Sequence, residues 1–364
     1  MRYKKLGRSG LLVSEICLGT MTFGGEAGGG WRAIGSLEQK PVDSLVKASF
    51  DAGVNFLDTA DVYSNGLSEQ VTGQALKNLK LPRDEIVIAT KAFGRIGGMG
   101  GLGGATEEEQ KEIARRLKAK NVNGLSRKHL FSAIDASLKR LQLDYVDLYQ
   151  IHGDDPLTPL EETIDALGDI VRSGRVRYIG LCNLPAWRTA KALGISERKN
   201  LPRFESMQMY YSIGGRDIER EVAPLAQEEN LAILPWSPLA GGFFSGKFSR
   251  DGAGPNDARR LSFDFPPVDK AKGFDIIDAM KKIGDAQGVS VARIALAYLL
   301  HKPFVTSVII GAKTIEQLND DIAATKVQLN AADLDTLDKV SSLAPEYPGW
   351  MVARQGEDRR SQVL

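Results

Sequence analysis

Residues 146–182 read VDLYQI, HGDDPLT, PLEETIDALGDIVRS, GRVR and YIGLC in succession. The runs Val146–Ile151 and Tyr178–Cys182 are short and apolar on successive residues, as in parallel strands that are covered on both faces. The segment Pro159–Ser173 between them is amphipathic with helical spacing and stops at Gly174. The stretch therefore predicts a strand, a helix and a second parallel strand.

The same alternation runs through the chain, with no break in composition that would divide it. Further helices are predicted at Pro41–Ala52, Ser126–Leu141 (with Ser126 as N-cap) and Arg220–Glu229. Eight strands are the number that a closed barrel needs, so we predict one α/β domain over residues 1–364, a (β/α)₈ TIM barrel. The predicted strands are Glu15–Gly19, Phe56–Asp58, Ile86–Thr90, Val146–Ile151, Tyr178–Cys182, Ser206–Met209, Ala232–Pro235 and Ser307–Ile310.

Four segments depart from this rhythm. Residues 1–14, with a Gly-Arg-Ser-Gly turn, predict a β-hairpin ahead of the barrel. Residues 93–125 form a long connection with a glycine-rich start and a charged helical end, which we interpret as solvated. Residues 241–267 form a polar loop with the length of a functional lid, and residues 343–364 form a tail in which Tyr347–Met351 is expected to close over a substrate.

Composition excludes several classes of function. Lys and Arg number 47 against 46 for Asp and Glu, a net charge of +1, which gives no support for a nucleic-acid or anionic-membrane surface. No stretch resembles a signal peptide or a membrane span, so we expect a cytoplasmic protein. The two cysteines and three histidines are scattered, which argues against a disulfide framework and a metal site. Oligomeric state and physiological substrate have no signal in the sequence.

Polar residues follow the predicted strands where a barrel gathers its catalytic groups. Asp58, Lys91 and His152 each stand at a strand end, and Tyr63 lies just beyond the first of them. Alone, each has an ordinary structural interpretation: an N-cap, a solvated strand end, a structural histidine and a turn aromatic. Together they fit carbonyl reduction by hydride, in which a tyrosine acidified by a lysine donates the proton and a histidine hydrogen-bonds the carbonyl oxygen.

At these residues the sequence resembles the aldo-keto reductase superfamily over nearly its whole length. Residues 58–66 (DTADVYSNG), followed by Ser68-Glu69, resemble the signature around the catalytic Asp and Tyr of the family. Thr90-Lys91 resembles the segment of its catalytic lysine, Gln150-Ile151-His152 that of its histidine, and residues 123–129 (NGLSRKH) a further typical segment. The resemblance implies that Asp58, Tyr63, Lys91 and His152 are catalytic.

The resemblance also implies an extended NADPH or NADP⁺ site, with NADH less favoured because of Lys313. Four positions depart from the usual family residues: Cys182 stands for serine, Gly153 for a larger residue (which widens the pocket), Asp321 for asparagine, and Gln317 where some members have arginine. The cofactor residues implied are Gly19, Thr20, Met21, Asp58, Asn183, Gln208, Trp236, Ser237, Pro238, Leu239, Gly241, Lys247, Gly311, Lys313, Gln317, Asp320 and Asp321.

The expected substrate is a small-molecule carbonyl or the corresponding alcohol. We expect its pocket to be lined by Trp31, Tyr63, Phe93, His152 and Trp350. Residues 98–103 (GMGGLG) match the dinucleotide fingerprint, but the acidic residues 107–109 that follow would repel a pyrophosphate, so we interpret the match as a flexible loop near the substrate mouth.

Two alternatives remain open at this point. The resemblance extends to potassium-channel β subunits, so the chain could be a cofactor-binding regulatory or accessory protein with slow turnover. The second alternative is a barrel enzyme of another chemistry, an isomerase or a lyase, which would need no nicotinamide site.

Overall fold

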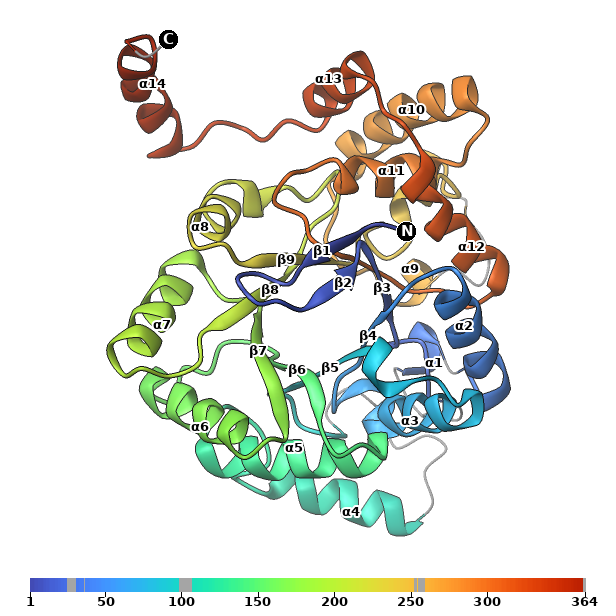
Figure 1. The fold of residues 1–364 in the computed structure, drawn as a ribbon. Coiled ribbons are helices and arrows are strands. Elements are labelled where there is room, and N and C mark those ends of the chain that lie inside the picture. The colour runs from blue at the N-terminus through green and yellow to red at the C-terminus, as the bar shows by residue number, and fades with distance from the viewer. Residues whose placement is uncertain (25–30, 36, 98–106, 252–253, 255–258, 363–364) are drawn as a thin grey trace.

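Eight parallel strands form the sheet at the centre of the structure, in the order β10-β3-β4-β5-β6-β7-β8-β9, and helices surround it (Figure 1). The computed structural model describes every residue except 25–30, 36, 98–106, 252–253, 255–258 and 363–364. A bridge between Ile233 and Val305, with the Thr306 amide donating to the Ile233 carbonyl at 2.9 Å, brings the two edges of the sheet together. The predicted (β/α)₈ barrel is confirmed.

All eight predicted barrel strands are present, with ends that differ by a few residues. The larger differences are at β5, β7 and β8, where pairing with neighbouring strands continues beyond the apolar runs. The barrel strands are β3 (Ile16–Gly19), β4 (Phe56–Asp58), β5 (Val87–Ala92), β6 (Val146–Ile151), β7 (Val176–Cys182), β8 (Phe204–Tyr210), β9 (Ala232–Trp236) and β10 (Val308–Ile310).

The helices that surround the barrel carry apolar faces that pack against the strands. Ser126 caps its helix as predicted, because its side chain accepts from the His129 amide. The described helices are α1 (Trp31–Ile34), α2 (Gln39–Asp51), α3 (Leu67–Leu79), α4 (Glu107–Lys118), α5 (Arg127–Leu141), α6 (Leu160–Arg172), α7 (Ala186–Arg198), α8 (Val222–Glu228), α9 (Arg259–Ser262), α10 (Lys270–Gln287), α11 (Val291–Leu300), α12 (Ile315–Ala323), α13 (Ala331–Val340) and α14 (Gly349–Arg360). Short 3₁₀ turns lie at η1 (Tyr63–Gly66), η2 (Arg83–Glu85), η3 (Asp217–Glu219), η4 (Phe243–Ser245) and η5 (Ala324–Lys326).

The interior of the barrel is apolar at the end where the strands begin. Alternate residues of each strand point inward, and Phe56, Ala89 and Leu148 pack there in one buried cluster. The predicted hairpin, β1 (Tyr3–Lys5) and β2 (Leu12–Ser14), lies across this end (Figure 1). Its Leu6 and Val13 are fully buried in the same cluster, so the hairpin seals the opening opposite the strand ends.

The remaining segments differ in their relation to the barrel. Helix α4 covers the charged part of 93–125, and its Glu108 and Lys111 are exposed, as predicted. The glycine motif at 98–103 lies outside the described residues. The expectation that the tail closes over the barrel mouth is not met here, because α14 stands apart from the barrel (Figure 1). Trp350 lies on α14, and the ring contact described for Trp350 is with Tyr347.

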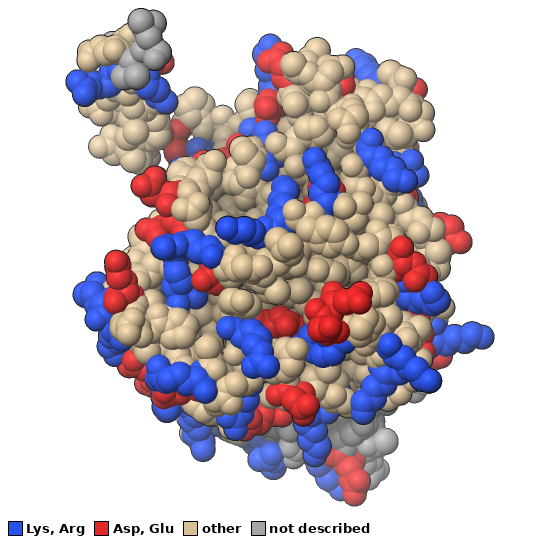
Figure 2. Space-filling view, viewed as in Figure 1, with Lys and Arg blue, Asp and Glu red and all other residues tan. Residues whose placement is uncertain are grey.

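Figure 2 shows positive and negative side chains interspersed over the hairpin face, in keeping with a net charge of +1. Within the described part of the chain, no single helix has the length and apolarity to cross a membrane. The pair α10 and α11, bent by 99°, meets that test only jointly and only by length and composition. The described residues include no His, Cys, Asp and Glu group suited to a metal ion.

Candidate active site

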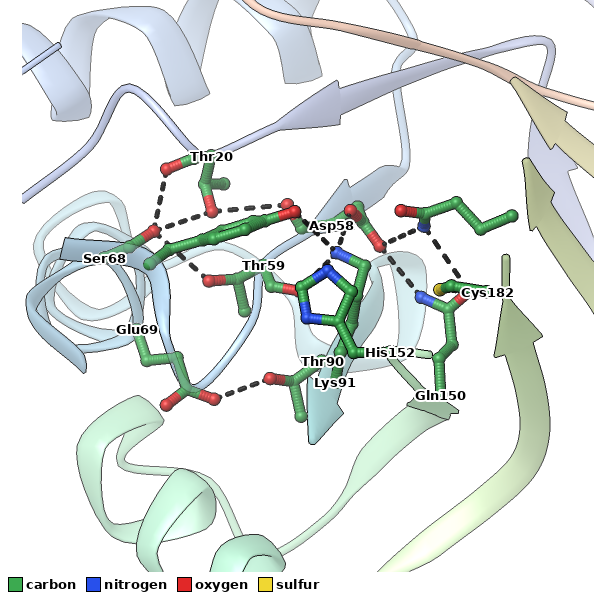
Figure 3. A network of polar contacts seen from close by, with 12 residues as sticks. Thr20, Asp58, Thr59, Ser68, Glu69, Thr90, Lys91, Gln150, His152 and Cys182 are labelled. Atoms are coloured by element: carbon green, nitrogen blue, oxygen red, sulfur yellow. Dashed lines mark hydrogen bonds and ion pairs between the residues drawn. The ribbon is translucent and has the colours of Figure 1, made fainter. Parts of the chain in front are cut away.

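The barrel interior turns from apolar to polar towards the strand ends. Asp58 follows Phe56 by two residues on β4, Lys91 follows Ala89 on β5, and Gln150 follows Leu148 on β6. Residues two apart on a strand share a face, so these polar side chains point into the same interior. All three are buried, and Figure 3 shows them converging.

Lys91 is the centre of this group. Its Nζ donates to Asp58 Oδ2 at 2.5 Å, to the Thr59 carbonyl at 2.8 Å and to the Tyr63 hydroxyl at 3.2 Å. The side chain is fully buried, which opposes its charge, yet the Asp58 carboxylate beside it raises the pKa of Lys91 above its ordinary value. The lysine therefore remains a cation with its three N–H groups directed at fixed acceptors.

Tyr63 lies on the turn between β4 and α3, and Lys91 Nζ sits 4.7 Å from its ring centroid. Burial raises the pKa of Tyr63, and Lys91 lowers it by less than burial raises it. Lys91 therefore acts on this phenol in the expected direction, and the net rise in the pKa of Tyr63 comes from burial. The hydroxyl stays protonated at neutral pH, the state that a proton donor needs.

His152 follows β6, and its ring meets that of Tyr63 edge to face, with centroids 5.8 Å apart. Its amide donates to the Ala92 carbonyl at 3.0 Å, which ties the residue to the end of β5. Burial, with the charge of Lys91, lowers the pKa of His152 to about 3. The imidazole is thus neutral and retains one N–H that can be directed at an oxygen.

The second carboxylate oxygen of Asp58 is bonded to Gln150, a residue to which the sequence analysis gave no role. Gln150 and Gln208 each donate from Nε2 to Asp58 Oδ1 at 2.9 Å (Figure 3). Gln150 precedes His152 by two residues, so the strand pattern predicts that its side chain points into the barrel. The pattern does not predict that its hydrogen-bond partner is Asp58. Cys182 Sγ lies 3.9 Å from Gln150 Oε1, where the weak S–H donor replaces a hydroxyl.

The structure brings several predicted cofactor residues to the same end of the barrel. Gly19 ends β3 and Thr20 and Met21 follow it, and the Thr20 amide and hydroxyl both donate to the Asp58 carbonyl. Asn183 has a left-handed backbone, with φ 58°, and its Oδ1 accepts from Trp236 Nε1 at 3.0 Å.

Aromatic rings surround Trp236 where it ends β9. Phe265 stacks on it with centroids 5.9 Å apart, and Tyr210 packs against it in a tilted arrangement. Phe265 belongs to the 241–267 loop, so this loop reaches the strand ends from which Asn183 and Trp236 project.

The loop after β9 is folded tightly at its base. Ser237 and Ala240 have left-handed backbones, and the Gly241 amide donates to Ser237 Oγ at 2.9 Å. Arg260 is buried and donates to the carbonyls of Ala240, at 2.5 Å, and Pro266, at 3.0 Å. Of the other predicted residues, Pro238 is buried, Leu239 is partly buried and Lys247 is exposed.

The segment after β10 presents exposed polar groups at the start of α12. Gly311 and Gln317 are exposed, and Gln317 Oε1 accepts from the Lys313 amide at 2.9 Å. Asp320 differs, since it already accepts from Ser290 Oγ at 2.7 Å and Arg293 Nε at 2.6 Å. Asp321 is buried, which raises its pKa to about 7.

Of the predicted substrate residues, Trp31 and His152 contact the ring of Tyr63. Trp31 is buried with its ring centroid 6.2 Å from that of Tyr63, and its indole Nε1 has no hydrogen-bond partner among the described residues. Phe93 packs against Gly153, where an added Cβ would lie 3.4 Å from the ring, so Phe93 already occupies the room that this glycine leaves. Trp350, on α14, is not brought to this site.

Comparison with known proteins agrees with this geometry. The model of the aldo/keto reductase family matches residues 15–342. The chain is 33% identical to a versiconal hemiacetal acetate reductase of Aspergillus parasiticus (96% of this chain, 99% of the relative). It is 34% identical to a probable voltage-gated potassium channel subunit beta of Arabidopsis thaliana (96% and 99%) and 33% identical to a putative aryl-alcohol dehydrogenase of Schizosaccharomyces pombe (93% and 95%). With a family match of this extent and relatives aligned almost end to end, the chain belongs to the aldo/keto reductase family of oxidoreductases.

Proposed function

We propose that the protein is an NADPH-dependent reductase of aldehydes or ketones, also able to oxidise the corresponding alcohols, with Tyr63 as the general acid and base. The observation that carries the proposal is the position of Lys91, which donates to Asp58 and Tyr63 at once in a buried site. Such an arrangement holds a phenol hydroxyl in a fixed place beside a fixed positive charge.

In the proposed reduction, Tyr63 gives its hydroxyl proton to the carbonyl oxygen as hydride reaches the carbonyl carbon. Lys91 then stabilises the tyrosinate that remains, and Asp58 keeps Lys91 charged and oriented. His152, neutral because its pKa is about 3, donates an N–H to the same oxygen and orients the carbonyl. In alcohol oxidation the tyrosinate accepts the proton instead.

The residues present fit a nicotinamide dinucleotide at the strand ends. Asn183 and Gln208 offer amide groups for a carboxamide, and Trp236 offers an aromatic face. Gly242 and Gly311 leave open space, since a Cβ built on either would meet nothing within 4 Å. Ser237, Lys247 and the N-terminus of α12 supply the donors and positive charge that phosphates require. When bound, the cofactor supplies or accepts the hydride.

We propose NADPH rather than NADH because two lysines, Lys247 and Lys313, lie in the segments proposed to hold the phosphates. Asp321 lies near one of these lysines, since the charge of Lys247 opposes the rise in the pKa of Asp321. Each carboxylate oxygen of Asp320 already accepts a hydrogen bond, from Ser290 or from Arg293, so Asp320 would contribute little to cofactor binding. The expected order of affinity is therefore NADPH above NADH.

We further propose that residues 1–364 act as one cytoplasmic domain on a small-molecule substrate held between Trp31, Tyr63, Phe93 and His152. Trp31 Nε1, which has no hydrogen-bond partner among the described residues, would favour a substrate with a hydrogen-bond acceptor near its carbonyl group. The similarity to a probable channel β subunit supports a second candidate, a cofactor-binding accessory protein with slow turnover.

The test is NADPH oxidation, then NADH oxidation, by purified protein offered a panel of aldehydes, ketones and quinones. Rapid turnover with NADPH is the expected result and ranks substrates. Quenching of tryptophan fluorescence by NADPH with no turnover on any member of the panel would favour the accessory role. No binding of either cofactor would refute both.

A further inference from the structure

The turn that presents Tyr63 is conformationally unusual. The three residues that follow Tyr63 all have left-handed backbones: Ser64 with φ 49°, Asn65 with φ 57° and Gly66 with φ 94°. Such conformations are unfavourable for residues with a side chain, so they persist only where the surroundings impose them. The contacts around this turn therefore determine where the Tyr63 hydroxyl lies.

One buried carboxylate links the turn to the strand of Lys91. Glu69, in the first turn of α3, is fully buried, and its Oε1 accepts from Thr90 Oγ1 at 2.6 Å. Thr90 immediately precedes Lys91 on β5 and points to the opposite face of the strand. Figure 3 shows this contact on the outer side of β5, separate from the Asp58 group.

Arg140, on α5, completes the arrangement. Its Nε donates to Glu69 Oε2 at 2.6 Å, with the arginine side chain 16% exposed. Its Cδ covers Gly66, where an added Cβ would come within 2.9 Å. The guanidinium thus pairs with Glu69 and packs against the last left-handed residue of the turn.

A second carboxyl group, that of Asp61, lies close to the ion pair of Glu69 and Arg140. Asp61 is buried, and this burial, together with the charge of Glu69, raises its pKa well above the ordinary value. The raised pKa favours the neutral form of Asp61, and the charge of Arg140 is paired with Glu69 instead. The Asp61 amide donates to the Lys91 carbonyl at 3.2 Å, a further tie between the turn and β5.

We infer that Glu69, held by Arg140 and Thr90, is a positioning residue that sets the distance between the Tyr63 hydroxyl and Lys91 Nζ. The inference rests on the proposed function. Both bonds of Glu69 are directional and involve a buried charge, so they fix the start of α3 against β5 more narrowly than apolar packing would. Loss of the bond to Thr90 would leave the turn held against β5 by the Asp61 amide and by the bonds of Lys91 itself, with less constraint on the position of the Tyr63 hydroxyl.

The test removes a single hydroxyl. Thr90→Val keeps the volume and the strand propensity but loses the bond to Glu69, and Thr90→Ser keeps the bond. We expect Thr90→Val to lower kcat about tenfold, since misplacement of a reacting group by about 1 Å can cost 100-fold. The dissociation constant of NADPH, from tryptophan quenching, should stay within about twofold because no proposed cofactor residue is touched. Thr90→Ser should restore kcat.

The pH profile separates positioning from stability. With Tyr63 farther from Lys91, the lowering effect of the lysine on the pKa of Tyr63 weakens. The alkaline decline of reduction in Thr90→Val should therefore move to higher pH. A crystal structure of the variant should show the Tyr63 hydroxyl farther from Lys91 Nζ than 3.2 Å.

Asp147→Asn is the matched control. Asp147 joins β6 to the same strand β5, accepting from the Ile88 amide at 2.8 Å and pairing with Arg83 at 2.7 Å, at the end away from the site. It should lower the melting temperature and leave kcat and the alkaline decline unchanged. Thr90→Val behaving like this control, with the 3.2 Å distance kept, would overturn the inference. An inactive wild type would contradict the proposed function instead, and the crystallographic distance would still decide the positioning role.

Discussion

The chemistry of the site depends on how burial and charge act on individual groups. Burial is the main reason why Tyr63 is a weaker acid and His152 a weaker base than usual, and the charge of Lys91 adds to the effect on His152. Lys91 remains charged in the same surroundings because Asp58 is its direct partner, at 2.5 Å. The result is a neutral phenol, a neutral imidazole and one fixed cation, which is the set of states that proton donation to a carbonyl requires.

These states predict a flat pH profile for reduction across the neutral range. His152 is neutral above its pKa of about 3, and Tyr63 is protonated below its raised pKa, so neither group changes charge in between. With saturating NADPH, kcat should change less than about twofold from pH 5.5 to 9 and decline only as the pH rises through the pKa of Tyr63. An inflection between pH 6 and 7 that His152→Gln abolishes would show instead that the histidine titrates during catalysis.

Among the elements, the loop over residues 241–267 is held by a buried arginine in its described part. Arg260, with a side chain 4% exposed, joins the carbonyls of Ala240 and Pro266 and so ties the two ends of the loop together. Phe265 then stacks on Trp236, and α9 contacts α1, the helix that follows β3. Under the proposed function, this loop would cover the bound cofactor.

Arg260→Ala should weaken NADPH binding about tenfold, because two buried carbonyls lose their donor and the loop loses its closed base. The dissociation constant from tryptophan quenching measures the effect. Arg250→Ala is the control: Arg250 is exposed on the same loop and pairs with Asp275 and Asp278 on α10. Equal effects of the two substitutions would mean that any change in this loop disturbs the cofactor, and the particular role of Arg260 would be lost.

Sequence periodicity predicted elements well where the signal is local. The strand at 146–151 was predicted to the residue, and Ser126 caps α5 as expected, because alternation and capping depend on near neighbours. Asp58, Lys91 and His152 were found as strand-end residues for the same reason. Gln150 and the Glu69–Arg140 pair were not, since their partners lie 92 and 71 residues away in the chain. The net rise in the pKa of Tyr63 also depends on burial, which a strand pattern does not give.

At the scale of the whole molecule, the barrel and the tail are separate structures. The hairpin seals one end of the barrel, and the polar residues gather at the other. Helix α14 lies beyond both (Figure 1). Tyr347 is 74% exposed and Trp350 46%, so little apolar surface holds this helix in place. The aromatic residues of the tail were expected at the substrate mouth. The composition of the tail does not indicate on which side of the barrel it lies, so the sequence could not place it.

Removal of residues 348–364 should therefore leave the barrel intact. We expect kcat to stay within about twofold and the melting temperature to shift by less than about 2 °C, the change that roughly 1 kcal/mol gives in a protein of this size. Differential scanning fluorimetry and the reductase assay measure both. A tenfold loss of kcat with an unchanged melting temperature would show that the tail reaches the mouth during turnover.

The most direct test of the central claim is NADPH oxidation by Tyr63→Phe beside the wild type, with one accepted carbonyl substrate. The account predicts that kcat falls at least about 100-fold, the usual lower range for loss of a general acid, while the dissociation constant of NADPH changes less than about twofold. Undiminished turnover by Tyr63→Phe would contradict the account, because the reaction would then proceed without the hydroxyl that is proposed to donate the proton.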